Sequence, residues 1–211
     1  MNSFNLDCRE CTRLATFLDD VKAKHPSYHA RPVPAFGVES PGLLVVGLAP
    51  GMHGANATGR PFTGDYAGVL LYKALYEYGF STAEESISAE DGLELINCRI
   101  TNAVKCLPPE NKPITDEIKR CNPYLAEEIA SLESGAVVFT LGGIAHKAVL
   151  RALGLKLKEY PFGHGVEYEL PTGQYLVTSY HCSRYNTQTR RLTEEMFMAI
   201  MARIRQYIDE R

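Results

Sequence analysis

The sequence predicts an α/β protein: a three-layer sandwich with a central four-stranded parallel sheet, helices on both faces, and a single domain spanning residues 1–211. Two observations predict this fold. Short apolar runs of strand length alternate along the chain with segments of helical periodicity, which is the order that builds a parallel sheet. Hydrophobic residues make up 45% of the chain and charged residues 22%, which suits one globular core.

Each expected element rests on a local pattern. In chain order we expect a helix at 9–24, a strand at 43–46, a helix at 68–78, a strand within 93–104, a helix at 115–134, a strand at 136–141, a helix at 144–153, a strand at 175–179 and a helix at 192–208. Leu14, Leu18 and Val21 share one face of the first helix. Thr115 offers an N-cap, because acidic residues follow it where the helix dipole favours them. Gly154 lies where a helix would stop.

The charge and the hydropathy of the chain limit which cellular compartment and which partners we expect. The formal net charge is -3, which taken alone argues weakly against a nucleic-acid binder. No apolar run approaches the ~20 residues that a membrane helix needs, and the N-terminus lacks the basic start and apolar core of a secretory signal. We therefore expect a cytoplasmic protein that binds no membrane, with its six cysteines present as thiols or metal ligands.

Polar loops follow three of the expected strands. The first loop is about a score of residues long, where ~2–6 residues would suffice. Its polar and aromatic side chains include those of His53, Asn56, Arg60, Phe62 and Asp65. The second loop carries Asn102 and Lys105, and the third is the segment 181–191, HCSRYNTQTRR. Such loops emerge at one edge of a parallel sheet, so we expect them to form a single pocket.

Four cysteines have a spacing that suits a metal site. Cys8 and Cys11 form a C-x-x-C pair, and Cys106 and Cys121 lie in a separate segment. Four thiolates suit a tetrahedral zinc ion or an iron–sulfur cluster. The alternative is a set of redox-active or buried cysteines that never meet.

The other two cysteines have simpler interpretations. Cys98 lies in an apolar strand and is typical of a small core residue. Cys182 follows His181 and would be a nucleophile in a Cys–His pair. Adjacent residues tend to point apart, which argues against that pair.

Taken jointly, the loops and the cysteines resemble the uracil-DNA glycosylase superfamily, more closely its iron–sulfur branch, and within it the type b (family 5) enzymes. The matching pieces are GLAPG with HGAN-TGRPFTGD, then ITNAVKCLPPENKP, then H-x-S-x-x-N-T-x-T-x-R-L at the third loop. The resemblance covers nearly the whole chain. It implies a structural [4Fe–4S] cluster with the ligands Cys8, Cys11, Cys106 and Cys121.

Residue matching separates the subfamilies. The related family 4 has an acidic residue directly after the glycine that ends the first strand, whereas Leu48 stands here, as in type b. The nearest acid of the loop is Asp65, and the type b family uses an Asp there. The chain departs from type b at Gly51, where Ala is expected, at Cys182, where Pro is usual, and at Arg190, where Gly is usual. These departures concern the shape of the DNA-contacting loop more than the chemistry.

The resemblance and the residue chemistry together assign roles. Removing a base builds positive charge on the sugar and negative charge on the departing base. We expect Asp65 to orient water and face the sugar, and His181 to donate a hydrogen bond or proton to the base oxygen. Asn102 offers an amide donor and acceptor to the base edge. Phe62 would stack on the base, worth ~1–3 kcal/mol.

Further residues are expected to bind substrate. The backbone and side chains expected around the base are those of Leu48, Ala49, Pro50, His53 and Asn56. The side chains expected to enter the minor groove and fill the gap left by the extruded base are Arg184, Tyr185 and Asn186.

Each of these residues also has an ordinary structural interpretation. Asp65 would cap the following helix, Phe62 would be core and Asn102 would hold a turn. The function expected is a monofunctional DNA glycosylase that excises uracil, with other deaminated or damaged bases left open. The alternatives are a non-catalytic damaged-DNA or nucleotide-binding iron–sulfur module and an iron–sulfur redox protein. We expect a monomer whose partner is DNA, single- or double-stranded.

Overall fold

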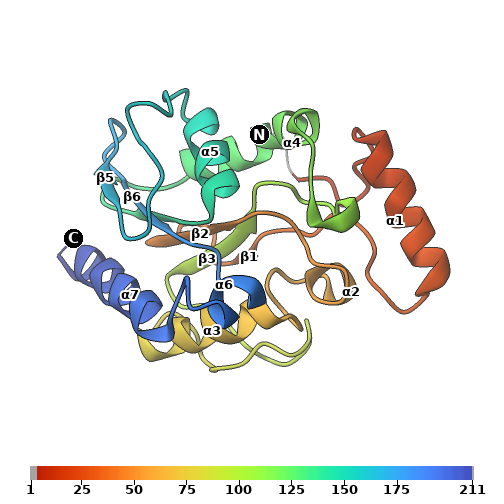
Figure 1. Ribbon diagram of the computed structural model, residues 1–211, viewed down its shortest axis with the longest axis horizontal. Coiled ribbons are helices and arrows are strands. Elements are labelled where there is room, and N and C mark those ends of the chain that lie inside the picture. Colours follow the sequence, from red (N-terminus) through yellow and green to blue (C-terminus); the bar gives the residue numbers. More distant parts are fainter. Residues whose placement is uncertain (1–3, 211) are drawn as a thin grey trace.

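The computed structural model describes residues 4–210 and places a mixed sheet at the centre of the protein (Figure 1). The strands are β1 (Phe36–Gly37), β2 (Leu43–Gly47), β3 (Cys98–Asn102), β4 (Val137–Leu141), β5 (Glu167–Glu169) and β6 (Tyr175–Ser179), in the spatial order β1-β3-β2-β4-β6-β5. The pairs β2–β3, β2–β4 and β4–β6 are parallel, whereas the edge strands β1 and β5 pair antiparallel. The expected sheet of four parallel strands therefore lacks the two antiparallel edge strands. β1 and β5 were not predicted, because they are too short to show a period in the sequence.

Helices fill the connections between strands. Those of the described residues are α1 (Thr12–Lys24), α2 (Ala55–Thr58), α3 (Tyr66–Glu77), α4 (Thr115–Ala130), α5 (Gly143–Ala152), α6 (Arg184–Gln188) and α7 (Glu194–Asp209), with a 3-10 turn at Pro109–Asn111. The expected cap at Thr115 is wrong: Ile114 occupies the cap position of α4. Its backbone N–H donates to Glu117 Oε2 at 2.8 Å, so the acidic residue of the first turn satisfies the helix start.

Two hydrophobic cores lie on opposite faces of the sheet. All five residues of β2 are buried, because helices cover both faces of this strand. Leu43 and Val45 point toward α3 and α7, and Leu44 and Val46 point toward α4 and α5. Figure 1 shows these three layers, with α1 standing beyond the edge of the sheet. Within the described part of the chain, none of the helices combines the length and apolar character that crossing a membrane requires.

The parallel register brings the ends of neighbouring strands to one edge. Gly47, the last residue of β2, lies opposite Asn102, the last residue of β3. Pairing continues briefly past the strands, since the N–H of Val104 donates to the carbonyl of Leu48 at 3.0 Å. The loops that follow β2 and β3 therefore start side by side, and the loop after β6 starts at the same edge, one strand farther along.

Candidate active site

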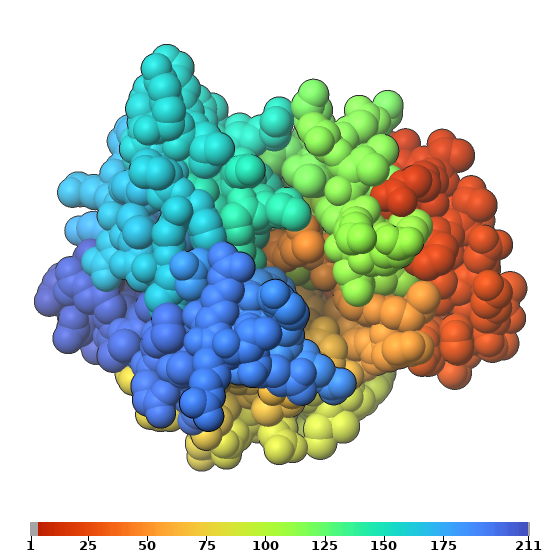
Figure 2. All heavy atoms as spheres, in the orientation of Figure 1, coloured from red at the N-terminus to blue at the C-terminus, as the bar shows by residue number. Residues whose placement is uncertain are grey.

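The three loops enclose one cavity of about 430 Å³ at this edge of the sheet. Its lining residues are Leu48, Ala49, Gly51, Ala55, Phe62, Asp65, Tyr66, Ala67, Asn102, Asn111, His181, Ser183 and Arg184. Figure 2 shows the hollow between the segments that come from residues near 50, near 110 and near 185. A larger hollow of about 650 Å³ opens beside it, between α3 and the start of α7, and shares Tyr66. We assign the site to the smaller cavity because all three loops converge there.

Asp65 lies at the start of α3, and its two carboxylate oxygens have different neighbours. Its Oδ1 accepts a hydrogen bond from the backbone N–H of Gly68 at 2.9 Å, which caps the helix. Its Oδ2 lies so close to Gly54 that a Cβ there would be 2.6 Å away. Burial raises the pKa of Asp65, and hydrogen bonds from the N–H groups of Gly68 and Ala67 only partly offset that shift.

The rings of His181 and Phe62 lie next to each other, nearly parallel, in the wall of the cavity. Their ring centroids are 6.0 Å apart and their planes are 25° from parallel. Burial lowers the pKa of His181 to about 4, so the imidazole is neutral near pH 7 and offers one N–H donor. Phe62 has a φ of 55°, a left-handed conformation that only a well-held non-glycine residue keeps.

Asn102 presents an unsatisfied acceptor. Its side chain is buried, and Oδ1 has no hydrogen-bond partner among the described residues. A buried acceptor without a partner costs ~1–3 kcal/mol, so a ligand N–H at this position would be favoured. Gly47 makes the arrangement possible: a Cβ there would lie 2.4 Å from Asn102 Oδ1 and 2.6 Å from the Phe62 ring.

Comparisons with known proteins place this geometry in a family. The model of the uracil DNA glycosylase superfamily matches residues 34–205. The chain belongs to this superfamily. It is 45% identical to the type-5 uracil-DNA glycosylase of Thermus thermophilus over 92% of this chain and 90% of that protein. It is 40% identical to the type-5 enzyme of Pyrobaculum aerophilum over 94% and 88% of the two chains, and 30% identical to the type-4 enzyme of Saccharolobus solfataricus over 85% and 79%. The resemblance inferred from the loop motifs is confirmed.

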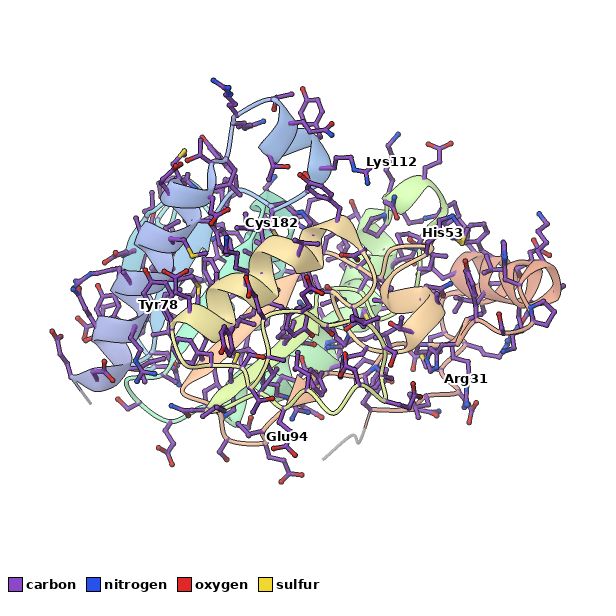
Figure 3. All side chains as sticks on the ribbon, turned by 90° about the horizontal axis from the view of Figure 1, so that it is seen from below. Arg31, His53, Tyr78, Glu94, Lys112 and Cys182 are labelled. Carbon is purple, nitrogen blue, oxygen red and sulfur yellow. The ribbon has the colours of Figure 1, made fainter. Side chains whose placement is uncertain are left out.

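Several of the residues expected to bind substrate do not line the described cavity: Pro50, His53, Asn56, Tyr185 and Asn186. The His53 side chain (Figure 3) contacts the segment after α1 instead, where its Nδ1 is 2.9 Å from the Tyr28 hydroxyl. Asn56 is fully buried, and its Nδ2 donates to the carbonyl of Met52 at 3.4 Å. Both side chains hold the loop after β2 rather than face the cavity.

The loop after β6 forms the short helix α6 beside the cavity. Asn186 Nδ2 donates to the carbonyl of His181 at 2.8 Å, so this residue supports the histidine from behind. The Arg184 guanidinium lies 5.0 Å above the Tyr66 ring, and Tyr185 is 70% exposed. Cys182 is buried against α3 (Figure 3), with its Sγ 3.3 Å from the Ala67 carbonyl, which leaves it no access to substrate.

The four spaced cysteines line one small cavity between α1, α4 and the end of β3. Burial, followed by the charge of Cys121, raises the pKa of Cys11 to about 11. Burial and the neighbouring thiols also raise the pKa of Cys106. Within residues 4–210, no set of three or more His, Cys, Asp or Glu side chains is arranged to hold a metal ion as it stands. The donor set still fits a cluster: four thiols share one site, and the repulsion between their thiolates is what a bound cation would relieve.

Four polar or aromatic residues in or beside the cavity were not predicted as site residues from the sequence: Tyr66, Asn111, Ser183 and Thr187. Tyr66, Asn111 and Ser183 line the cavity, and the Tyr66 hydroxyl lies 3.2 Å from Thr187 Oγ1. Their places in or next to the matched motifs were an available signal: Tyr66 directly follows the motif that ends at Asp65, Asn111 lies in the second motif, and Ser183 is the serine of the third.

Proposed function

We propose that this protein is a uracil-DNA glycosylase that hydrolyses the N-glycosidic bond of uracil in DNA. One observation carries the proposal. Asp65, Asn102 and His181 come from three segments far apart in the chain and line a single cavity. Type-5 uracil-DNA glycosylases that are 40–45% identical to nearly all of the chain support the same activity.

The reaction proposed here begins with a nucleotide turned out of the DNA stack. Phe62 stacks against the base. Asn102 Oδ1, which has no partner among the described residues, accepts a hydrogen bond from the N3–H of uracil. Because His181 is neutral near pH 7, it donates a hydrogen bond to a uracil carbonyl oxygen and stabilises the departing anion, without transferring a full proton.

Asp65 supplies the second half of the chemistry. Its carboxylate faces the sugar and orients the attacking water while positive charge grows at C1′. The C1′–N1 bond breaks with both electrons going to uracil, the water oxygen bonds to C1′, and the carboxylate of Asp65 accepts the proton that the water releases, which solvent then returns to the uracil anion. A charge in a water-poor cavity stabilises that cationic transition state more than the neutral ground state.

The proposed partner is DNA, and the proposed contacts are Arg184 and Tyr185, which project from α6 beside the cavity. A structural [4Fe–4S] cluster is proposed on the cysteines Cys8, Cys11, Cys106 and Cys121. When bound, it would cross-link the N-terminal segment to α4 and the end of β3, within one domain. No step of base removal uses it.

The test uses purified protein and a duplex with one uracil. Wild-type protein should leave an abasic site that alkali cleaves, while the same duplex with thymine stays intact. The Asp65→Asn protein should bind the duplex and excise its uracil at least ~10²-fold more slowly. Binding without cleavage by wild-type protein would instead favour a damaged-DNA-binding module.

A further inference from the structure

The segment 59–65 carries Phe62 and Asp65, yet its backbone is not held by a strand or a long helix. Phe62 has a φ of 55°, which a non-glycine residue avoids in an unconstrained loop. Part of the restraint is local, because the Tyr72 hydroxyl donates to the carbonyl of Pro61 at 3.0 Å. Gly68 adds a close approach, since a Cβ there would lie 1.8 Å from the Phe62 carbonyl oxygen. Neither contact explains the buried charge of the same segment.

That buried charge is Arg60, whose side chain is only 4% exposed. Its Nη2 donates to Asp91 Oδ2 at 2.5 Å and to Ser86 Oγ at 2.7 Å, and its Nε donates to Thr63 Oγ1 at 3.0 Å. Thr63 and Ser86 also share a hydrogen bond of 2.6 Å between their hydroxyls. The guanidinium thus ties the segment that carries Phe62 to a second segment some thirty residues later in the chain.

The second segment, 82–94, is an irregular excursion in which Asp91 accepts several of the hydrogen bonds. Its ends are pinned together by a bridge between Ser81 and Leu95. Inside it, Asp91 accepts from the backbone N–H groups of Ile87 at 2.8 Å and Leu93 at 3.0 Å. Burial opposes the charge of Asp91, but the hydrogen bonds from Arg60 and these N–H groups hold its pKa well below the usual range.

The two segments also touch through their backbones, where the N–H of Gly64 donates to the carbonyl of Ser86 at 3.2 Å. Gly64 directly precedes Asp65. The described lining of the active-site cavity includes Phe62 and Asp65 but none of Arg60, Ser86 and Asp91. Any effect of this ion pair on the reaction must therefore act through the residues it positions.

We propose that Arg60 and Asp91 are positioning residues: their ion pair, buried on the Arg60 side, clasps the excursion 82–94 onto the segment 59–65 and so holds Phe62 and Asp65 in the geometry that base removal needs. The proposal rests on the proposed glycosylase function. It predicts that loosening the clasp lowers the rate of the chemical step, because a displacement of about 1 Å in a reacting group costs ~10²-fold in rate.

The main variant is Asp91→Asn, which removes the charge and keeps the size of the side chain. Glu90→Gln is the matched control, since Glu90 is exposed on the same excursion. Single-turnover excision by Asp91→Asn should fall ~10²-fold, with the Kd for a uracil duplex changed by less than about threefold. Glu90→Gln should match wild type in both. Ser86→Ala removes two hydrogen bonds and no charge, so its excision rate should lie between the rates of Asp91→Asn and Glu90→Gln.

A double variant separates positioning from general destabilisation. If Asp91 acts through Asp65 and Phe62, the loss of rate in the Asp65→Asn/Asp91→Asn protein should be smaller than the product of the two single losses. Full multiplication of the two losses, or a normal rate for Asp91→Asn in folded protein, would overturn the proposal. If wild-type protein excises nothing, the proposed function fails instead. In that case amide hydrogen exchange tests the clasp: exchange at residues 60–68 must be faster in Asp91→Asn than in wild type, and unchanged in Glu90→Gln.

Discussion

Asp65 Oδ1 accepts a 2.9 Å hydrogen bond from the N–H of Gly68, so the carboxylate proposed to face the sugar is also the N-cap of α3. A cap of this kind contributes ~1 kcal/mol to helix stability. The structural and the catalytic interpretations of Asp65 are therefore compatible, because each uses a different oxygen. Variants of this residue can separate the two.

Asp65→Asn should abolish most activity and spare the fold. The Asn side chain caps as well as Asp, and burial penalises the charge that it removes, so the Tm should not fall. The rate should fall by at least ~10²–10³, the loss typical of one preorganised electrostatic contact. Single-turnover excision and thermal unfolding measure the two effects. In Asp65→Ala the cap is lost as well, so the Tm should drop by about 2–4 °C. A near-normal rate for Asp65→Asn would show that something else stabilises the sugar.

The pH dependence of excision should reflect Asp65 and not His181. Asp65 must be ionised to act, and burial raises its pKa, so the rate should fall as the pH drops, beginning above the usual carboxyl range. The pKa of His181 is lowered to about 4, so its ring stays neutral and adds no step near 6.5. Single-turnover rates from pH 4 to 9 check this. A step near 6.5 that His181→Gln removes would contradict the neutral imidazole.

Arg184→Ala and Tyr185→Ala should impair activity on paired DNA more than on single strands. Opening a duplex costs a few kcal/mol that a free strand does not require, and a side chain that fills the gap offsets that cost. Tyr185 is 70% exposed and is placed to reach DNA without supporting the fold. The measurement is the excision rate on the two forms of one sequence. Equal losses on both would mean that α6 does not act as a wedge.

Cys106→Ser should disrupt the proposed cluster and destabilise the region around it. Anaerobically purified wild-type protein should be brown and hold about four irons per chain, and the variant should be colourless and less soluble. Cys98→Ser is a useful comparison, because Cys98 lies in β3 outside the four-cysteine cavity and its loss should leave the iron content unchanged. Stoichiometric zinc without iron would leave a structural four-cysteine site but exclude the cluster.

Gly47→Ala should close the base-binding side of the cavity. The added Cβ would lie 2.4 Å from Asn102 Oδ1 and 2.6 Å from the Phe62 ring, and both groups are buried and cannot retreat freely. We expect a lower Tm and excision reduced more than tenfold. Gly51→Ala is the matched control for folding, since its Cβ would meet only Asp65 Oδ2, at an ordinary 3.5 Å. A fully active Gly47→Ala protein would show that the base does not bind between Asn102 and Phe62.

Much of the sheet was predictable because its interior strands are buried on both faces. Such strands appear in the sequence as short continuous apolar runs, and Tyr175–Ser179 was expected with the bounds observed. The edge strands β1 and β5 and the helices α2 and α6 escaped prediction, because two to five residues are too few to show a period. The cap of α4 was misplaced by one residue, since the reach of Glu117 back to Ile114 decides where that helix begins.

The chain order and the loop motifs, by themselves, determined the α/β class, the family and the three loops that meet at one edge of the sheet. Which side chains face the cavity was decided by the tertiary structure. His53 turns to Tyr28 and Asn56 turns inward, although both lie in the motif that carries Asp65. The pairing of Arg60 with Asp91 is likewise absent from any local pattern. A loop side chain points where its distant partners allow, and only folding brings those partners together.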